Sequence, residues 1–379
     1  MTIVIALDSF KGSLSSIEAG NAVRDGLKKI TEAEIIVRPL ADGGEGTIEA
    51  LIQGLGGKLI DIEVTSPLGK KIEVHYGIIL EKKLAVIEMA KAAGITIHNE
   101  KNPTIASTFG VGEIINDAMM RGCREFIIGI GGSATNDGGT GLLKALGVEF
   151  YDKDNNTISD GASGLSDIRK ISLTNLNPII RECNFKIACD VNNPLFGENG
   201  ATYVYGPQKG LTQDQIQIID QGMKNYAKVT AELTGKDYSQ LQGAGAAGGL
   251  GFAFVSFLGA KLYKGIDLIL ELTEMENYLK KADIVFTGEG CLDVQTSMGK
   301  APIGVARLAK KHGALVIGLS GCVKDGAEKC NDNGIDAFFP ITRDIMTIET
   351  ALKKENAISN IQKTAEQVIR LINAVDSKK

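Results

Sequence analysis

Four glycine-rich segments of the sequence combine unhindered backbone with carboxylate, hydroxyl or lysine side chains: residues 8–13, 42–47, 131–139 and 288–293. Each lies where an apolar run stops, which is typical of a loop at the carboxyl end of a parallel strand. Glycine leaves backbone N–H groups free to surround an anion, and a helix N-terminus adds partial positive charge. Acidic side chains in these loops would repel a bare phosphate, but they suit a divalent cation such as Mg²⁺ bound between carboxylate and phosphate. The pattern therefore indicates nucleotide chemistry.

The segment 131–139 is the most informative, because it mixes many glycines with Ser, Thr, Asn and Asp side chains. We interpret it as a ligand-binding loop rather than a structural turn. Lys11 and Lys300 lie in or just after such loops and are candidates to neutralise phosphate or carboxylate; the alternative is that each is a solvated surface lysine. Asp190 follows a predicted strand over 186–189, and it is either a general base or the first residue of an Asx turn.

The standard nucleotide fingerprints do not explain these loops. A Walker A loop needs Ser or Thr after Gly-Lys, and the Gly-Lys pairs here are followed by Leu59, Lys71, Asp237 and Ala301. The segment 243–248 matches G-x-G-x-x-G, but a polar stretch precedes it instead of a strand, which disfavours a nicotinamide site. Close helix packing and a nucleotide role both remain open for that segment, because glycine serves either.

The elements that must position these loops follow two patterns. Near both chain ends, apolar runs alternate with helical patterns, as in a parallel α/β sheet; the strands are expected at 2–7, 35–37, 284–287 and 315–319. Ser15 and Glu18 have the spacing of a capping box that begins a helix. Between 58 and 89, short turns join three strands, which favours antiparallel pairing.

The expected organisation is therefore an α/β domain built from residues 1–62 and 283–379, with an inserted α/β domain of mixed sheet over 63–282. Within the insert we expect a helix at 111–120, a strand at 126–130, a proline- and glycine-rich loop at 192–210 and a long helix at 213–233. A C-terminal helix is expected over 348–375.

The amino-acid composition disfavours several classes of function. The 379 residues carry 41 basic and 46 acidic side chains, a net charge of −5, which lacks the basic footprint of a nucleic-acid or membrane-surface binder. No apolar run reaches about 18 residues, and Asp8 and Lys11 interrupt the N-terminal run, so neither a spanning helix nor a signal peptide is expected. Three scattered histidines disfavour zinc, and six sparse cysteines without a CxxC pair are expected to be reduced thiols of a cytoplasmic protein.

Seven ordered motifs resemble the bacterial type-1 glycerate kinase family, and together they run from Ile3 to about Gly321. They are DSFKGSL (8–14), ADGGEG (41–46), GIGGSATNDGG (129–139), ACDVNNPL (188–195), GPQKG (206–210), the glycines of 243–251 and TGEG (287–290). Two positions depart from the family pattern: Leu7 stands where proline is usual, and Cys291 stands where arginine is usual.

The resemblance implies ATP-dependent phosphorylation of D-glycerate with Mg²⁺, usually at the 2-hydroxyl. It also implies a flavodoxin-like domain and an inserted domain with the active site in the cleft between them. Phosphorylation at the 3-hydroxyl stays open, as does the oligomeric state, monomer or homodimer. Two other classes share part of the pattern: a nicotinamide-dependent hydroxy-acid dehydrogenase, which would need a strand before its glycine motif, and a non-catalytic anion-binding protein, which has little reason to place Asp and Glu in its loops.

Residue roles follow from loop position and chemistry as hypotheses. Phosphate binding is expected from Gly131, Gly132, Ser133, Thr135, Asn136, Gly288, Gly290 and Lys300. Mg²⁺ is expected to be held, directly or through water, by Asp42, Glu45, Glu289 and Asp293. Lys11 is expected to neutralise the glycerate carboxylate or the transferred phosphoryl group, with Asp8 or Asp190 accepting the hydroxyl proton. Further substrate contacts are expected from Ser9, Asn193, Gln208 and Lys209.

Overall fold

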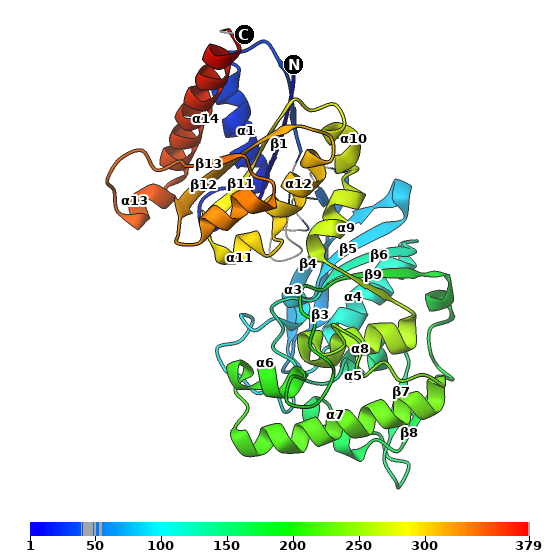
Figure 1. The fold of residues 1–379 in the computed structure, drawn as a ribbon. Helices are drawn as coiled ribbons and strands as arrows, with labels where there is room; N and C mark the ends of the chain where they lie inside the picture. The colour runs from blue at the N-terminus through cyan, green and yellow to red at the C-terminus, as the bar shows by residue number, and fades with distance from the viewer. Residues whose placement is uncertain (39, 41–47, 49–50, 53–54, 378–379) are drawn as a thin grey trace. The chain divides into compact units, whose positions relative to one another are not determined.

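The computed structural model describes residues 1–38, 40, 48, 51–52 and 55–377. The chain divides into two compact units (Figure 1). Unit 1 lies within Met1–Asp42, Glu49–Leu55 and Ile266–Lys379, and unit 2 lies within Gly43–Ile48 and Gly56–Gly265. Residues 266–282, which the sequence groups with the insert, belong to unit 1. Among the described residues, no helix has both the length and the apolar character that crossing a membrane requires.

Unit 1 is built on a five-stranded sheet in which every described pairing is parallel. Its strand order is β13 (Ala337–Pro340), β12 (Leu315–Val323), β11 (Ile284–Leu292), β1 (Thr2–Leu7) and β2 (Glu34–Val37). The two chain ends meet here, because β1 pairs with β11 from Ile3↔Ile284 onward. The predicted parallel α/β sheet is thus confirmed.

The helices of unit 1 begin where the sequence chemistry allows. In α1 (Ser16–Leu27), the Ser15 hydroxyl accepts from the Glu18 N–H and the Glu18 carboxylate accepts from the Ser15 N–H, so the predicted capping box is confirmed. Helix α1 lies beside α14 (Lys354–Asp376), the blue and red helices of Figure 1. The unit also contains α9 (Gly265–Leu272), α10 (Met275–Leu279), α11 (Val294–Ser297), α12 (Ala301–Lys310) and α13 (Ile348–Leu352).

Unit 2 contains a six-stranded mixed sheet. Its order is β10 (Lys261–Tyr263), β9 (Asn184–Ala188), β6 (Glu125–Gly129), β5 (Leu84–Glu88), β4 (Lys71–Ile79) and β3 (Lys58–Thr65). The strands β3, β4 and β5 are antiparallel to their neighbours in turn, as their short turns predict, whereas β5, β6, β9 and β10 run parallel. A small antiparallel pair, β7 (Glu149–Tyr151) and β8 (Lys170–Ser172), lies apart from this sheet.

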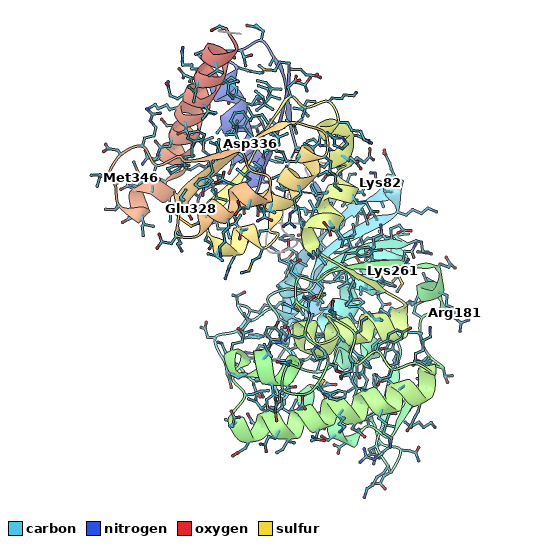
Figure 2. All side chains as sticks on the ribbon, in the orientation of Figure 1. Lys82, Arg181, Lys261, Glu328, Asp336 and Met346 are labelled. Carbon is cyan, nitrogen blue, oxygen red and sulfur yellow. A yellow bond between two sulfur atoms is a disulfide. The ribbon has the colours of Figure 1, made fainter. Side chains whose placement is uncertain are left out.

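Apolar helix faces and aromatic rings form the core of unit 2. Its helices are α3 (Met89–Ala93), α4 (Phe109–Met120), α5 (Thr140–Ala145), α6 (Ala201–Lys209), α7 (Gln213–Thr234) and α8 (Ala246–Leu258). Tyr226 of α7 packs edge-on against Phe252 of α8 and Phe150 of β7, and all three are buried. Charged side chains such as Lys82, Arg181 and Lys261 are exposed on this unit, as Glu328 and Asp336 are on unit 1 (Figure 2).

Three local expectations are wrong. The predicted loop over 192–210 contains α6, which tolerates Pro207 near its C-terminal end and stops at Gly210. The predicted C-terminal helix is interrupted at Lys353, between α13 and α14. The segment 288–293 is not a loop, because β11 continues through Leu292 in register with β12. Gly288 permits this continuation: its φ is +149°, and a Cβ there would lie 1.8 Å from the Leu319 carbonyl oxygen.

The expectation that all cysteines are reduced is also wrong for one pair. Cys291 on β11 and Cys322 on β12 form a disulfide, with their Cα atoms 4.7 Å apart. The two residues are direct partners in the parallel register of these strands. Cys123, Cys183, Cys189 and Cys330 are free thiols.

Candidate functional site

The carboxyl ends of three parallel strands of unit 2 bring several predicted residues to one edge. Glu88, Gly129 and Ala188 are register neighbours at the ends of β5, β6 and β9. The segment 131–139 therefore leaves the sheet beside Asp190, whose carboxylate accepts a hydrogen bond from the Gly265 N–H at 2.9 Å. This contact differs from an Asx turn, because its donor lies on a distant segment of the chain.

Asp137 fixes the shape of the 131–139 segment. It is fully buried, and its carboxylate accepts from the Thr108 N–H and hydroxyl and from the N–H groups of Gly139 and Gly141, at 2.8–3.1 Å. Burial raises the pKa of Asp137, and these hydrogen bonds offset part of the rise. Asp137 thus ties the segment to the starts of α4 and α5, a positioning role that the sequence does not reveal.

The two ends of the segment differ in exposure. Gly131 and Gly132 are exposed, and a Cβ built on Gly131 would meet nothing within 4 Å, so a ligand can approach their backbone. Ser133, Thr135 and Asn136 are buried. The Asn136 amide donates to the Thr202 hydroxyl at 3.0 Å, but Thr135 Oγ1 and Asn136 Oδ1 lack a hydrogen-bond partner among the described residues. Buried polar atoms usually have a hydrogen-bond partner, and a water molecule or a ligand can supply one.

Lys209, at the end of α6, reaches the same segment. Its ammonium donates to Ser133 Oγ at 2.8 Å and to the Thr135 carbonyl at 2.6 Å, and the residue is 2% exposed. Burial lowers the pKa of Lys209 to about 7, although the nearby charge of Asp137 opposes this shift. The structure therefore joins two of the predicted phosphate-binding residues to a predicted substrate-binding lysine.

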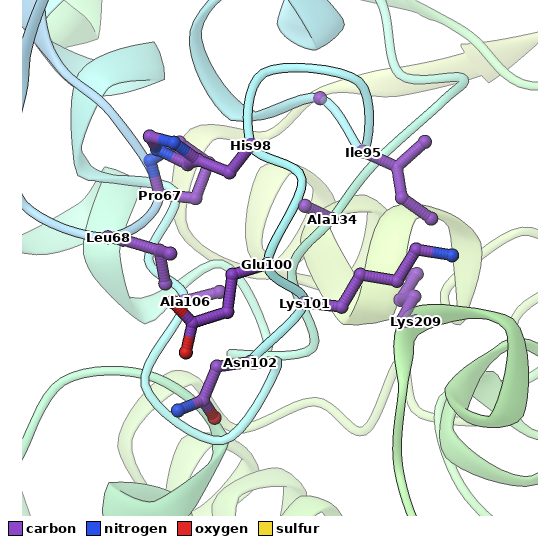
Figure 3. A pocket seen from close by; sticks show the side chains of 11 residues that line it. Pro67, Leu68, Ile95, His98, Glu100, Lys101, Asn102, Ala106, Ala134 and Lys209 are labelled. Carbon is purple, nitrogen blue, oxygen red and sulfur yellow. The ribbon is translucent and has the colours of Figure 1, made fainter.

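A small pocket lies beside this lysine (Figure 3). It is lined by Lys209, Ala134, Ile95, His98 and Lys101, among others. The Lys101 ammonium donates to the Gln208 carbonyl at 3.1 Å, which connects the pocket wall to the exposed Gln208.

Asn193 lies outside the lining of that pocket. Its side-chain amide donates to the Asn199 carbonyl, and its side-chain oxygen accepts from the Tyr205 hydroxyl at 2.6 Å. These contacts hold the turn before α6 in place.

The glycines of the 243–251 segment pack against this site. Ala247, Gly248 and Gly249 have left-handed backbone inside α8, and the Gly248 carbonyl accepts from the Gly138 N–H at 2.9 Å. A Cβ on Gly248 would lie 2.1 Å from the Thr135 carbonyl oxygen. Close packing, one of the two alternatives left open by the sequence, is thus confirmed as a reason for these glycines.

A Gly248→Ala variant is expected to lose about 2–5 kcal/mol of unfolding free energy, because it combines positive-φ strain with a backbone clash. Gly235→Ala is the matched control, since Gly235 has a similar φ of +74° but open space around its Cβ position. The control should lose only about 1 kcal/mol. Urea unfolding of both variants checks this, and equal losses would contradict the packing explanation.

A second group of predicted residues lies at the carboxyl edge of the unit 1 sheet. Asp8 follows β1 and is 5% exposed; its N–H donates to the Gly288 carbonyl at 2.9 Å, and its carboxylate accepts from the Ser9 N–H. A Cβ on Gly290 would lie 3.3 Å from the Lys11 backbone nitrogen. The structure therefore brings Asp8, Ser9, Lys11, Gly288 and Gly290 together, with Lys11 exposed.

The carboxylates predicted to bind metal form a local arrangement around one hydroxyl. Thr296 Oγ1 lies 2.7 Å from a carboxylate oxygen of Glu289 and 3.4 Å from one of Asp293. Asp293 caps α11. Burial alone would raise its pKa, but hydrogen bonds from the Thr296 and Gln295 backbone and the charge of Lys300 hold the pKa below its usual value.

Two carboxylates close together suit Mg²⁺, which takes one or two of them and completes its shell with water and phosphate oxygens. Asp42 and Glu45, the other predicted metal ligands, lie outside the described residues. Within the residues that are described, no three His, Cys, Asp or Glu side chains are grouped as a ready-made metal site.

Two candidate residues are missing from the sequence prediction. Glu88 is buried at the end of β5 and accepts from the Ile48 N–H at 3.0 Å. The sequence signal that could have identified Glu88 is a carboxylate at the end of an apolar run, which is also how Asp8 and Asp190 are recognised. Thr287, buried at the same edge as Asp8, has a hydroxyl without a partner among the described residues, and no sequence pattern marks it.

Comparison with known proteins identifies relatives over the whole chain. The model of the glycerate kinase family matches residues 3–373. A glycerate kinase of Haemophilus influenzae is 41% identical over 375 residues, covering 98% of this chain and 99% of the relative. The glycerate 2-kinase of Escherichia coli is 40% identical over 371 residues, covering 97% of each protein.

A solved structure gives the same result. The crystal structure of a candidate glycerate kinase 2 from Salmonella typhimurium LT2 has a TM-score of 0.92 and 41% identity, and the match covers 100% of this chain and 99% of that one. The α/β fold, the ordered motifs and the full-length similarity agree. This chain belongs to the glycerate kinase family.

Proposed function

We propose that the protein transfers the γ-phosphoryl group of ATP to the 2-hydroxyl of D-glycerate, giving 2-phospho-D-glycerate and ADP. The observation that carries this proposal is the similarity, over nearly the whole chain, to glycerate kinases that include a glycerate 2-kinase. The chemistry needs positioned phosphates and neutralised charge more than covalent help, and the glycine-rich strand ends of both units suit that task.

In this proposal the exposed backbone of Gly131 and Gly132 binds phosphate oxygens through N–H groups. Ser133, Thr135 and Asn136 are buried behind them and hold the loop in shape, helped by Lys209, whose ammonium binds both Ser133 and Thr135. A loop that is already ordered loses little conformational entropy when the nucleotide binds.

The unit 1 edge supplies the remaining phosphate and cation contacts. Gly288, Gly290 and Lys300 bind phosphate oxygens, and Lys11 neutralises the glycerate carboxylate or the phosphoryl group in transfer. Glu289 and Asp293, together with Asp42 and Glu45, would hold Mg²⁺, which supplies charge neutralisation for the phosphates when it is bound.

Asp190 accepts the proton of the attacking hydroxyl as that oxygen bonds to phosphorus and the bond to the ADP oxygen breaks. It is favoured over Asp8 because its carboxylate is exposed and oriented by the Gly265 N–H, whereas Asp8 is almost completely buried.

Ser9, Asn193 and Gln208 are assigned to contacts with glycerate. In this proposal unit 1 is the flavodoxin-like domain, unit 2 is the inserted domain, and the protein acts in the cytoplasm as a monomer or homodimer.

The test is direct. Purified protein is incubated with ATP, Mg²⁺ and D-glycerate, and the product is identified by phosphorus NMR. We expect 2-phosphoglycerate. A 3-phosphoglycerate signal would move the acceptor to the 3-hydroxyl, and formation of neither isomer would overturn the proposed activity. Glycerate-dependent reduction of NAD in a parallel assay would instead support a dehydrogenase.

A Lys11→Met variant is expected to lose about 10- to 100-fold in kcat/KM, the value of one charge-assisted hydrogen bond to an anion. Its unfolding free energy should change little, because Lys11 is exposed. Lys28→Met, another exposed lysine of unit 1, is the matched control and should stay within about twofold of the parent. Parent-like kcat and KM values for Lys11→Met would remove the residue from this role.

A further inference from the structure

The ends of β11 and β12 extend beyond the rest of the unit 1 sheet. Pairing between β1 and β11 stops at Leu7↔Gly288, and pairing between β12 and β13 stops at Ser320↔Pro340. The register of β11 with β12 continues to Leu292↔Val323. Among the described strands, residues 289–292 and 321–323 therefore have only each other as pairing partners. A two-stranded pair of this length is marginally stable without further support.

The Cys291–Cys322 disulfide lies within this two-stranded tip. Cys322 is exposed and Cys291 is partly exposed, so a small thiol or disulfide can reach the pair. The other four thiols are different: they are buried or half-buried, and burial raises the pKa of each, which makes them poor nucleophiles. One pair of cysteines thus combines accessibility with bonding geometry.

The tip adjoins residues assigned to the reaction. Gly290 precedes Cys291 and lies against the Lys11 backbone, and its carbonyl oxygen would lie 2.5 Å from a Cβ on Gly321. Ser320 Oγ accepts from the Leu292 N–H at 3.0 Å and donates to the Cys322 carbonyl at 2.6 Å. A covalent bond between the two strands at this point restricts how the Gly288–Gly290 backbone can adjust to a ligand.

We propose that Cys291 and Cys322 form a reversible thiol–disulfide pair that locks the β11–β12 tip when oxidised and lowers phosphoryl transfer. Disulfides of cytoplasmic proteins are usually transient or redox-sensing, which fits an accessible pair beside functional residues. The oxidant is a low-molecular-weight disulfide such as oxidised glutathione. The Cys322 thiolate attacks one of its sulfurs and releases a thiolate; the Cys291 thiolate then attacks the mixed disulfide and releases the second. Two electrons pass from the cysteines to the glutathione disulfide, and the two glutathione thiolates take up the two protons that the cysteine thiols lost when they became thiolates.

The first measurement is the redox state of the pair. Protein equilibrated with oxidised glutathione should contain four free thiols, and after reduction it should contain six. Peptide mass spectrometry should locate the bond between Cys291 and Cys322. Six thiols in the oxidised sample, or a bond between other cysteines, would overturn the proposal.

The second measurement is the conformation of the tip. Amide hydrogen exchange of residues 289–292 should be at least about tenfold faster in the reduced protein, because the cross-link no longer holds the strands together. Equal exchange in both states would show that the disulfide locks nothing. This readout does not depend on catalysis.

The third measurement rests on the proposed kinase function. Oxidation should lower kcat/KM for ATP at least about fivefold, and reduction should restore it, because nucleotide-binding loops commonly gate turnover. Cys291→Ser and Cys322→Ser should abolish the sensitivity to oxidised glutathione, whereas Cys183→Ser, a half-buried thiol of unit 2, should retain it. Identical kinetics of the oxidised and reduced enzyme would overturn the switch. Absence of glycerate phosphorylation in both states would overturn the proposed function instead, and hydrogen exchange would still decide the switch.

Discussion

Replacing Asp190 by Asn is expected to lower kcat for glycerate phosphorylation by about 10²–10⁴, the contribution of a positioned general base. The amide cannot take up the hydroxyl proton, but its oxygen can still accept the Gly265 N–H that orients the parent carboxylate. The fold should therefore persist, and KM for glycerate should change far less than kcat. Steady-state kinetics of the purified variant, with its melting temperature as a check, measure both effects.

Two comparisons make this result specific. Asp154→Asn changes an exposed aspartate in a surface turn of unit 2 and should leave kcat unaltered. Asp8→Asn changes the rejected candidate base, and we expect a smaller loss from it than from Asp190→Asn. A parent-like kcat for Asp190→Asn, with a large loss for Asp8→Asn, would transfer the role to Asp8.

Lys209 is expected to make the stability of the protein depend on pH. Burial lowers its pKa to about 7 in the folded protein, against about 10.4 for an unfolded lysine. Between these values the unfolded chain binds more protons than the folded one, so the unfolding free energy rises with pH. Below about pH 7 the protein bears the full cost of burying the charge, and that cost is relieved as the pH increases.

Urea unfolding of the parent and of Lys209→Met between pH 6.5 and 9.5 tests this. The difference in unfolding free energy, parent minus variant, should increase with pH by up to about 1.4 kcal/mol per unit. The difference isolates Lys209 from other titrating groups. Lys236→Met removes an exposed lysine of the same unit and should leave the slope of the parent intact. A pH-independent difference for Lys209→Met would mean that the buried ammonium keeps an ordinary pKa.

Local sequence patterns, such as turn length and helix-capping residues, predicted the elements whose structure depends on neighbouring residues. The short turns between β3, β4 and β5 predicted antiparallel pairing, and Ser15 with Glu18 predicted the start of α1. The same patterns gave wrong predictions where tertiary contacts determine the secondary structure. Proline and glycine predicted a loop over α6, yet packing in unit 2 supports a helix there. Glycines predicted a loop after Thr287, yet β12 offers Gly288 a pairing partner that lies far along the chain.

The candidate site divides in the same way. Its position at the carboxyl ends of parallel strands was predictable, because alternating strands and helices predict a parallel sheet whose ligand-binding loops lie at that edge. The different roles of residues of the same type could not be predicted from the sequence. Asp137 and Asp190 are both aspartates near strand ends, but one is buried under four hydrogen bonds and the other is exposed. Pairing of Cys291 with Cys322 depends on strand register, which spacing alone does not give.

The sheet of unit 1 joins both ends of the chain, and this has a consequence for biosynthesis. On the ribosome, β1 and its neighbour β2 emerge long before the other neighbour of β1, β11, which begins only at Ile284. All of unit 2 is translated before β11, so unit 2 can fold while β1 still lacks its partner β11. Such distant pairing slows folding and leaves one edge of an apolar strand without its partner in the meantime. Premature termination before residue 284 should therefore release a folded unit 2 together with β1, whose partner β11 is missing. We expect chaperones to bind the unpaired edge of this apolar strand.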